Sequence, residues 1–236
     1  SSGTGIGSTT TYYNASNRLS NNNPTFKCMN QNDLYTVDNE LGNGALTYPI
    51  GLITADEVVF AGGVTTGEGG KANENYYLYT GSNYRTMTPY AFASYNGSMY
   101  TQLFGIDSTG VIRRFWSSSG TQGVRPVINI KKSVELEGTG TAKDPYRIID
   151  TDLEDLLAKN LILANKEIKT RSLPFTTSTT VTDTTTGVIY KAEDDWGDTY
   201  YFAGNPTDNW VKFANFYWRI IRINGDGSIR MIYQGT

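Results

Sequence analysis

The 236-residue sequence contains no histidine. Histidine is the side chain that proteins use most often as a general base and as a metal ligand, so the commonest acid–base and metal chemistry is excluded. Catalysis would have to use carboxylates with shifted pKa values, for which Asp56-Glu57 and Asp194-Asp195 are adjacent candidates. Their neighbours in the sequence favour a helix cap and a turn instead. We therefore expect no catalytic residue, no metal site and no cofactor, and dependence on calcium, which binds oxygen ligands, stays open.

Cysteine is almost as scarce, because Cys28 is the only one in the sequence. A single cysteine excludes a disulfide within the chain. Two alternatives stay open for it. The thiol is buried, or its partner lies on a segment or chain outside this sequence.

Charge and long apolar runs are also limited. Lys, Arg, Asp and Glu together make up 18% of the residues, and the net charge is −3. Like charges form no block, so we predict no basic surface for nucleic acid or anionic lipid. No apolar run approaches the roughly 18 residues of a membrane-spanning helix. We therefore expect neither a nucleic-acid partner nor a membrane span in this chain.

The sequence is rich in Thr, Ser, Asn, Gly and Tyr instead. Threonine and tyrosine favour strands, whereas serine, asparagine and glycine favour turns. This composition is typical of β-rich surface and filament proteins. It predicts an extracellular or cell-surface location.

Residues 73–122 hold seven of the seventeen tyrosines, spaced by small polar residues. Rigid aromatic rings between adaptable polar side chains are the composition of an antibody paratope. Ordinary loop packing explains the same composition, and both interpretations stay open. If the stretch is a recognition surface, its candidate ligand-binding residues are Tyr84, Arg85, Tyr90, Phe92, Tyr95, Asn96, Tyr100, Arg114 and Trp116.

The octet that follows, residues 123–130, reads Gly-Val-Arg-Pro-Val-Ile-Asn-Ile. Its β-branched residues, Val124 among them, predict a short buried strand, and Pro126 restricts it to a strand start or an edge position. Arg125 lies between apolar neighbours. We expect its guanidinium to meet a buried carboxylate or carbonyl groups, because an unpaired buried charge is costly.

Two helices are predicted. The first runs from the N-cap Thr54 to Gly62, with Glu57 at the capping-box position. The second covers residues 151–168, whose apolar stripe would bury itself against a neighbouring subunit. The stripe residues expected at that contact are Leu153, Leu156, Leu157, Leu161 and Ile162.

Strands are expected along the rest of the chain, and Asn224 to Gly227 is a strong hairpin turn between two of them. The expected segments are a short strand or turn at 9–13, an edge strand at 24–37, and strands at 46–53, 175–191, 200–204, 210–213, 216–223 and 228–233.

Two motifs resemble a known family. Gly123-Val124-Arg125-Pro126-Val127 is preceded by Tyr84-Arg85-Thr86-Met87-Thr88-Pro89, where the family usually shows Trp-Thr-x-Ser-Pro. Together they resemble the bacterial C-type-lectin-like fold, in the branch of formylglycine-generating-enzyme-like domains and retroelement variable proteins. The resemblance implies an α+β, β-rich mixed fold of short strands and hairpins with one or two helices.

A second resemblance concerns the order of the chain. Residues 209–230 look like the front half, and residues 22–149 like the back half, of a family of surface proteins from Gram-positive gut bacteria. The order of the halves is inverted here. The implied organisation is a C-terminal half-domain at 1–149, a helical connector at 150–173, and a strand-rich part at 174–236. That last part would complete the same or a neighbouring domain.

Three accounts of the inverted order remain open: a chain spanning the junction between repeated or polymerised subunits, a circular permutation, or a cleaved protein. The resemblance implies a non-enzymatic extracellular subunit of a bacterial surface filament or adhesive display. Its partners would be further copies of itself, with a host or cell-surface protein or glycan as another. The alternative is a monomeric variable ligand-binding module. An enzyme of the formylglycine-generating type would need a cysteine pair, which one cysteine cannot supply.

Overall fold

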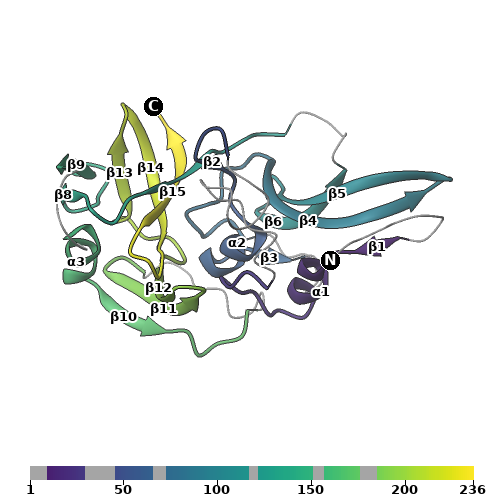
Figure 1. The fold of residues 1–236 in the computed structure, drawn as a ribbon, viewed down its shortest axis with the longest axis horizontal. Coiled ribbons are helices and arrows are strands. Elements are labelled where there is room, and N and C mark those ends of the chain that lie inside the picture. The colour runs from purple at the N-terminus through teal and green to yellow at the C-terminus, as the bar shows by residue number, and fades with distance from the viewer. Residues whose placement is uncertain (1–9, 30–45, 66–72, 117–121, 151–156, 176–184) are drawn as a thin grey trace.

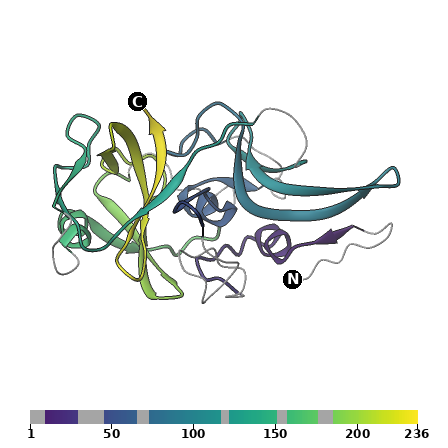
Figure 2. The ribbon, with the colours of Figure 1, turned by 45° about the horizontal axis from the view of Figure 1, so that its top comes forward.

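The computed structural model describes residues 10–29, 46–65, 73–116, 122–150, 157–175 and 185–236. These residues form two sheets that lie next to each other along the long axis of the molecule (Figure 1). A hairpin of the smaller sheet extends beyond the body at one end, and the larger, curled sheet forms the other end (Figure 2). The architecture is therefore β-rich α+β, as the sequence predicts, although the described residues form three helices rather than the expected one or two.

The smaller sheet has the strand order β1-β4-β5-β6-β3. Its strands are β1 (Thr11–Tyr12), β3 (Val64–Thr65), β4 (Tyr84–Tyr95), β5 (Ser98–Ile106) and β6 (Val111–Trp116). The helices α1 (Asn14–Ser20) and α2 (Ala55–Ala61) lie beside it, and α1 packs against β4. The short strand predicted near residues 9–13 is thus confirmed as β1.

The larger sheet contains ten strands in the described part of the chain. Its main path is β10 (Glu167–Thr170), β11 (Val188–Asp194), β12 (Gly197–Tyr201), β14 (Phe216–Ile223), β13 (Trp210–Phe213), β9 (Tyr146–Asp150) and β8 (Glu135–Glu137). A branch continues from β14 through β15 (Ile229–Gly235) and β7 (Val127–Ile130) to β2 (Ile50–Gly51). The pairs β10–β11 and β13–β9 are parallel.

Strands from distant parts of the sequence meet inside this sheet. β7 pairs with β15, and β9 pairs with β13. The strands of residues 174–236 therefore pair directly with those of residues 1–149, and β10 from the connector range joins the same sheet. The main hydrophobic core contains residues from both parts of the chain, among them Val127 of β7, Ile220 of β14 and Met231 of β15.

Local signals at two places are confirmed. Thr54 Oγ1 accepts a hydrogen bond from Glu57 N, and Glu57 Oε2 accepts one from Thr54 N, which completes the predicted capping box of α2. The helix ends at Gly62, whose φ of 119° suits glycine. Residues 224–227 connect the antiparallel strands β14 and β15, as predicted.

The predicted helix at 151–168 is partly wrong. In the described residues, α3 spans Leu157–Ala164 and stops before Ile168. Ile168 belongs to β10, where it pairs with Ile189. A β-branched residue favours a strand when a partner strand is at hand, and that partner lies 21 residues away in the sequence. Leu153, Leu156 and the side chain of Leu157 lie outside the description.

Ile162 is not available to a neighbouring subunit in this fold. Its side chain is fully buried in the core of its own chain, where α3 packs against β8. Leu161 is half-buried against the same core. At Ile162, the apolar stripe of α3 therefore packs against the core of its own chain and not against a neighbouring subunit.

This placement gives a direct prediction. Ile162→Val removes one buried methylene and should lower the free energy of unfolding by about 1 kcal/mol. Because the contact is internal, urea unfolding should give the same loss at low and at high protein concentration. A loss that grows with protein concentration would assign Ile162 to a subunit interface instead.

Three strand predictions need correction. Residues 24–29 form no strand, and the rest of the predicted edge strand lies outside the description. Of residues 46–53, only β2 is a strand. Val124 is 63% exposed rather than buried, because β7 begins only at Val127, after Pro126. Proline lacks the N–H that a ladder position needs, so the strand starts behind it.

Candidate functional site

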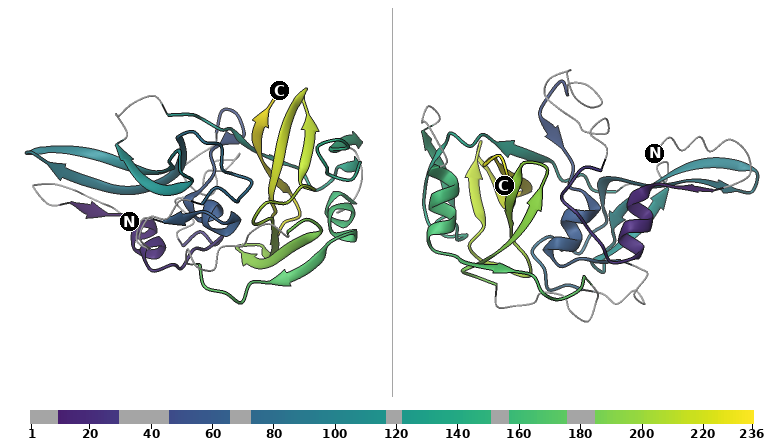
Figure 3. Two further views of the ribbon diagram at one scale, coloured as in Figure 1. Left: turned by 180° about the vertical axis from the view of Figure 1, so that it is seen from behind. Right: turned by 60° about the horizontal axis from the view of Figure 1, so that its bottom comes forward.

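The feature that stands out from the body is the hairpin of β4 and β5, whose residues 86–106 we call the arm. It projects from the molecule in every view (Figures 1, 2 and 3). Its turn is Asn96-Gly97, with φ values of 49° and 78°. Two residues with positive φ make the type I′ turn that suits the twist of antiparallel strands, and Asn-Gly is its preferred sequence. The Asn-Gly pair is a local signal for this hairpin, whereas the overall composition of residues 73–122 does not indicate it.

The arm is bent at its base by Pro89. The pairing of β4 with β5 shifts register on both sides of this residue, which lies opposite Leu103. Proline cannot donate to the ladder, so a strand tolerates it at such irregularities. The shift also interrupts the alternation of buried and less buried residues along β4, so that Tyr90 is half-buried and the next residue, Ala91, is buried.

The arm carries no charge. Every residue from Thr86 to Ile106 is uncharged. Natural proteins commonly protect projecting strands with lysine or other charged side chains. A long neutral arm lacks that protection, which is a property expected of a contact surface.

One face of the smaller sheet gathers aromatic rings at the root of the arm. The Tyr90 ring meets Tyr12 and Phe104 edge to face, with centroids 5.7 and 5.1 Å away. The Arg114 guanidinium carbon lies 5.9 Å from the Tyr90 centroid. Tyr12 is 49% exposed and Arg114 is exposed, so this cluster of Tyr12, Tyr90 and Arg114 faces solvent. A ring stacked under a cation is well suited to recognition.

The structure brings some of the predicted ligand-binding residues to the arm. Tyr95 is 59% exposed at the tip, Asn96 occupies the turn, and Tyr100 is 37% exposed on β5. Phe92 is half-buried and pairs with Thr101, on the face opposite that of Ala91 and Gln102. Trp116 pairs with Gln102 at the end of β6, and its side chain lies outside the description.

Tyr84 and Arg85 do not belong to that surface. Tyr84 is 2% exposed, and its hydroxyl donates to Leu78 O at 2.9 Å. Burial raises the pKa of Tyr84 to about 12. Arg85 is half-buried at the base of β4, where its backbone N–H donates to Gly123 O. Tyr84 is therefore a core residue, because its ring lies under Arg125 rather than toward solvent.

Tyr12 belongs to this exposed cluster but is not among the ligand-binding residues predicted from the sequence. It comes from β1, about eighty residues before Tyr90 in the chain, and reaches the cluster through the pairing of Tyr12 with Ala91. The Thr-Tyr run at residues 9–13 indicates a strand but not its partner. Only the pairing with β4 makes it part of the site.

The adjacent carboxylates are held in structural contacts. Asp56 receives two hydrogen bonds from Arg18 at 2.9 Å, and Glu57 caps α2 while it pairs with Arg222 and Arg230. Asp194 Oδ2 accepts from Arg222 and from Gly225 N at 2.8 Å. These contacts agree with the cap and turn interpretation of the sequence.

The described residues also bear on metals and membranes. Among them, no three Cys, Asp or Glu side chains lie together in a way that could hold a metal ion. Within the same ranges, none of the helices has both the length and the apolar character that crossing a membrane requires.

Comparison of the chain with protein families, with curated proteins and with solved structures found no match. The functional interpretation therefore depends on the residues and geometry described above.

Proposed function

We propose that this protein is a non-enzymatic, extracellular subunit of a bacterial surface filament or adhesive display, built on a C-type-lectin-like domain. The observation that carries the proposal is the projecting, uncharged arm with Tyr95 and Tyr100 exposed on it. A hairpin tip that leaves the body buries little surface of its own. Large exposed rings on such a tip contribute more to contact with another molecule than to folding.

The inverted halves bear on one part of this proposal, namely that both segments belong to a single domain. The segments that resemble the back and front halves of the surface-protein family meet in one sheet, at β7–β15 and at β9–β13. This pairing is what a circular permutation requires, since a permuted chain supplies all the strands of one domain, whereas a chain that spans two subunits would place the two segments in separate domains. Fragments of separate domains would not need to pair.

The first experiment compares wild type with a variant that carries Tyr95→Ala and Tyr100→Ser. Sedimentation velocity and electron microscopy over a concentration series should show assemblies for the wild type only. Both residues are exposed, so the free energy of unfolding should change by no more than about 0.5 kcal/mol. Trp196→Ala serves as a matched control, because Trp196 is 57% exposed on a different hairpin turn.

The results separate the alternatives. A wild type that stays monomeric but binds a panel of neutral oligosaccharides or surface proteins through the arm would favour the monomeric ligand-binding module, which the Tyr12, Tyr90 and Arg114 cluster also fits. A wild type that neither assembles nor binds would overturn the proposal. If the double variant assembles as well as the wild type, the arm is not part of the assembly contact.

A further inference from the structure

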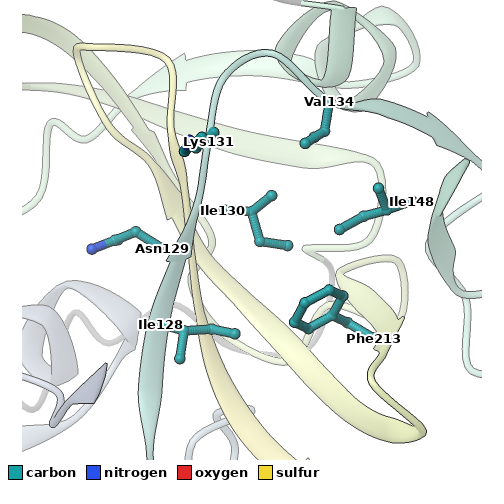
Figure 4. Close-up of a pocket in the computed structure, with 7 residues that line it drawn as sticks. All are labelled: Ile128, Asn129, Ile130, Lys131, Val134, Ile148 and Phe213. Atoms are coloured by element: carbon teal, nitrogen blue, oxygen red, sulfur yellow. The ribbon is translucent and has the colours of Figure 1, made fainter. Parts of the chain in front are cut away.

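The larger sheet contains an open, mostly apolar pocket of about 380 Å³. Ile128 and Ile130 of β7 form one side of it, Ile148 of β9 and Val134 lie across from them, and Phe213 closes one end (Figure 4). The pocket exists because the sheet curls, so that β7 faces β9 and the end of β13 without pairing with either in the described residues.

Two exposed phenylalanines lie at this end of the sheet, Phe213 in the pocket lining and Phe216 next to it. Phe213 is 37% exposed and Phe216 is 39% exposed, and the two pair across the turn that joins β13 to β14. That turn, Ala214-Asn215, has positive φ at both residues, 52° and 66°. Non-glycine residues adopt this conformation only at some cost. Two exposed phenylalanines beside an open apolar pocket are the kind of surface that marks a contact site.

Charge limits what the pocket can accept. Among the described residues that line it, Lys131 is the only charged one, and its side chain is exposed. A charged ligand would lose its hydration without gaining a partner in the apolar part of the pocket. The occupant should therefore be uncharged and should present an apolar or aromatic group.

The arm of this chain has these properties. Residues 86–106 are uncharged, and Tyr95 presents an exposed ring beside a tight turn. The ring could pack against Phe213 in the edge-to-face or offset manner of aromatic pairs, while its hydroxyl stays toward solvent. Residues 86–106 and the apolar part of the pocket carry no charge, so a contact between them buries apolar surface and leaves no charge without a partner.

Position excludes a contact within one molecule. The arm points away from one end of the long axis, whereas β7, β9 and β13 lie toward the other end in all views (Figures 1, 2 and 3). The arm of one copy can reach only the pocket of another copy. A contact between two different surfaces is heterologous, and it generates an open chain of subunits unless the rotation between them closes a ring.

We propose that the tip of the arm of one copy docks in the β7–β9–β13 pocket of the next copy, which links the subunits head to tail. This inference rests on the proposed function and specifies its partner and its surface. The contact area of a single hairpin tip is small, so each contact is weak and assembly depends on protein concentration.

Complementation of two variants tests the proposal. Tyr95→Glu disables the arm and keeps the pocket, and Phe213→Glu disables the pocket and keeps the arm. Each variant alone should stay monomeric at concentrations at which the wild type forms longer assemblies. Mixed in equal amounts, they should form a one-to-one dimer and nothing longer, because only one productive contact remains. Sedimentation velocity measures all three samples.

A control variant tests whether the added charge alone prevents assembly. Trp196→Glu places the same charge at a site that is 57% exposed on the turn between β11 and β12, outside the arm and outside the residues that line the pocket, and it should assemble like the wild type. Circular dichroism checks that all variants are folded. If the wild type assembles and Phe213→Glu assembles equally, the pocket is not the docking site, although the filament proposal survives. If the wild type never assembles, both fail.

Discussion

Glu57→Ala should destabilise the protein by about 3–5 kcal/mol, the loss typical of breaking a buried ion pair by removing one partner. Glu57 is 3% exposed at the start of α2. Its Oε1 lies 3.3 Å from Nε of Arg222, and its Oε2 lies 3.2 Å from Nη2 of Arg230. Without the carboxylate, two largely buried guanidinium groups lose their shared anion.

Urea unfolding measures this loss. Glu137→Ala is a suitable control, because Glu137 also pairs with an arginine but at the surface, with Arg147 at 2.9 Å. Exposed pairs contribute little, so the control should lose no more than about 1 kcal/mol. Equal losses in the two variants would show that the Glu57 cluster does not hold α2 to β14 and β15.

The same residue predicts a dependence on pH. Burial by itself would raise the pKa of Glu57, but the charges of Arg230 and Arg222 lower this pKa from the ordinary value of 4.5 to about 2. Between these values the unfolded chain binds a proton that the folded protein does not, so stability falls as the pH falls. The contribution is complete above pH 4.5 and is lost as the pH approaches 2.

A comparison of wild type with Glu57→Gln isolates this effect from other carboxylates. The difference in unfolding free energy between them should be constant above pH 4.5 and should shrink toward pH 2. A difference that stays constant across that window would contradict the assignment.

Arg125→Ala is the second large loss we expect, about 3 kcal/mol. Arg125 is 8% exposed, and its guanidinium donates to Leu78 O, Tyr233 O and Gln234 Oε1 at 2.9–3.1 Å. It also lies over the Tyr84 ring, 5.1 Å from the centroid. Its removal leaves carbonyls without donors and a cavity against Tyr84.

Arg125→Lys should recover less than half of this loss, because a lysine ammonium cannot span three separated acceptors as the planar fork does. Arg114→Ala is the matched control, since Arg114 is exposed over Tyr90 and its removal should cost no more than about 0.5 kcal/mol. Thermal and urea unfolding give the measurement. Full recovery by lysine would mean that charge alone, rather than the fork geometry, is what the site uses.

The sequence predicts those features that neighbouring residues determine. The capping box of α2 and the turn at 224–227 need only a few adjacent residues, and both are confirmed. The expectation that Arg125 meets carbonyl groups is also confirmed, because the cost of a buried charge applies wherever the partners come from.

Features that depend on distant partners could not be predicted in this way. Tyr84 and Tyr95 lie in the same Tyr-rich stretch, yet one is buried under Arg125 and the other is exposed at a tip. Residue 168 is a strand position only because β11 lies beside it. The pocket results from the curl of the larger sheet, and no single segment encodes that curl.

The position of β7 between β2 and β15 has a consequence for how the chain acquires its structure. The ribosome makes β7 and β9 well before β13, β14 and β15. Until these later strands are synthesised, the apolar residues of β7 and β9 have no partner strands to pack against. Contacts of such long sequence separation form slowly, and exposed strand edges in the meantime favour wrong pairings. Biogenesis of this protein should therefore depend on chaperones that shield residues 127–150 until the later strands emerge.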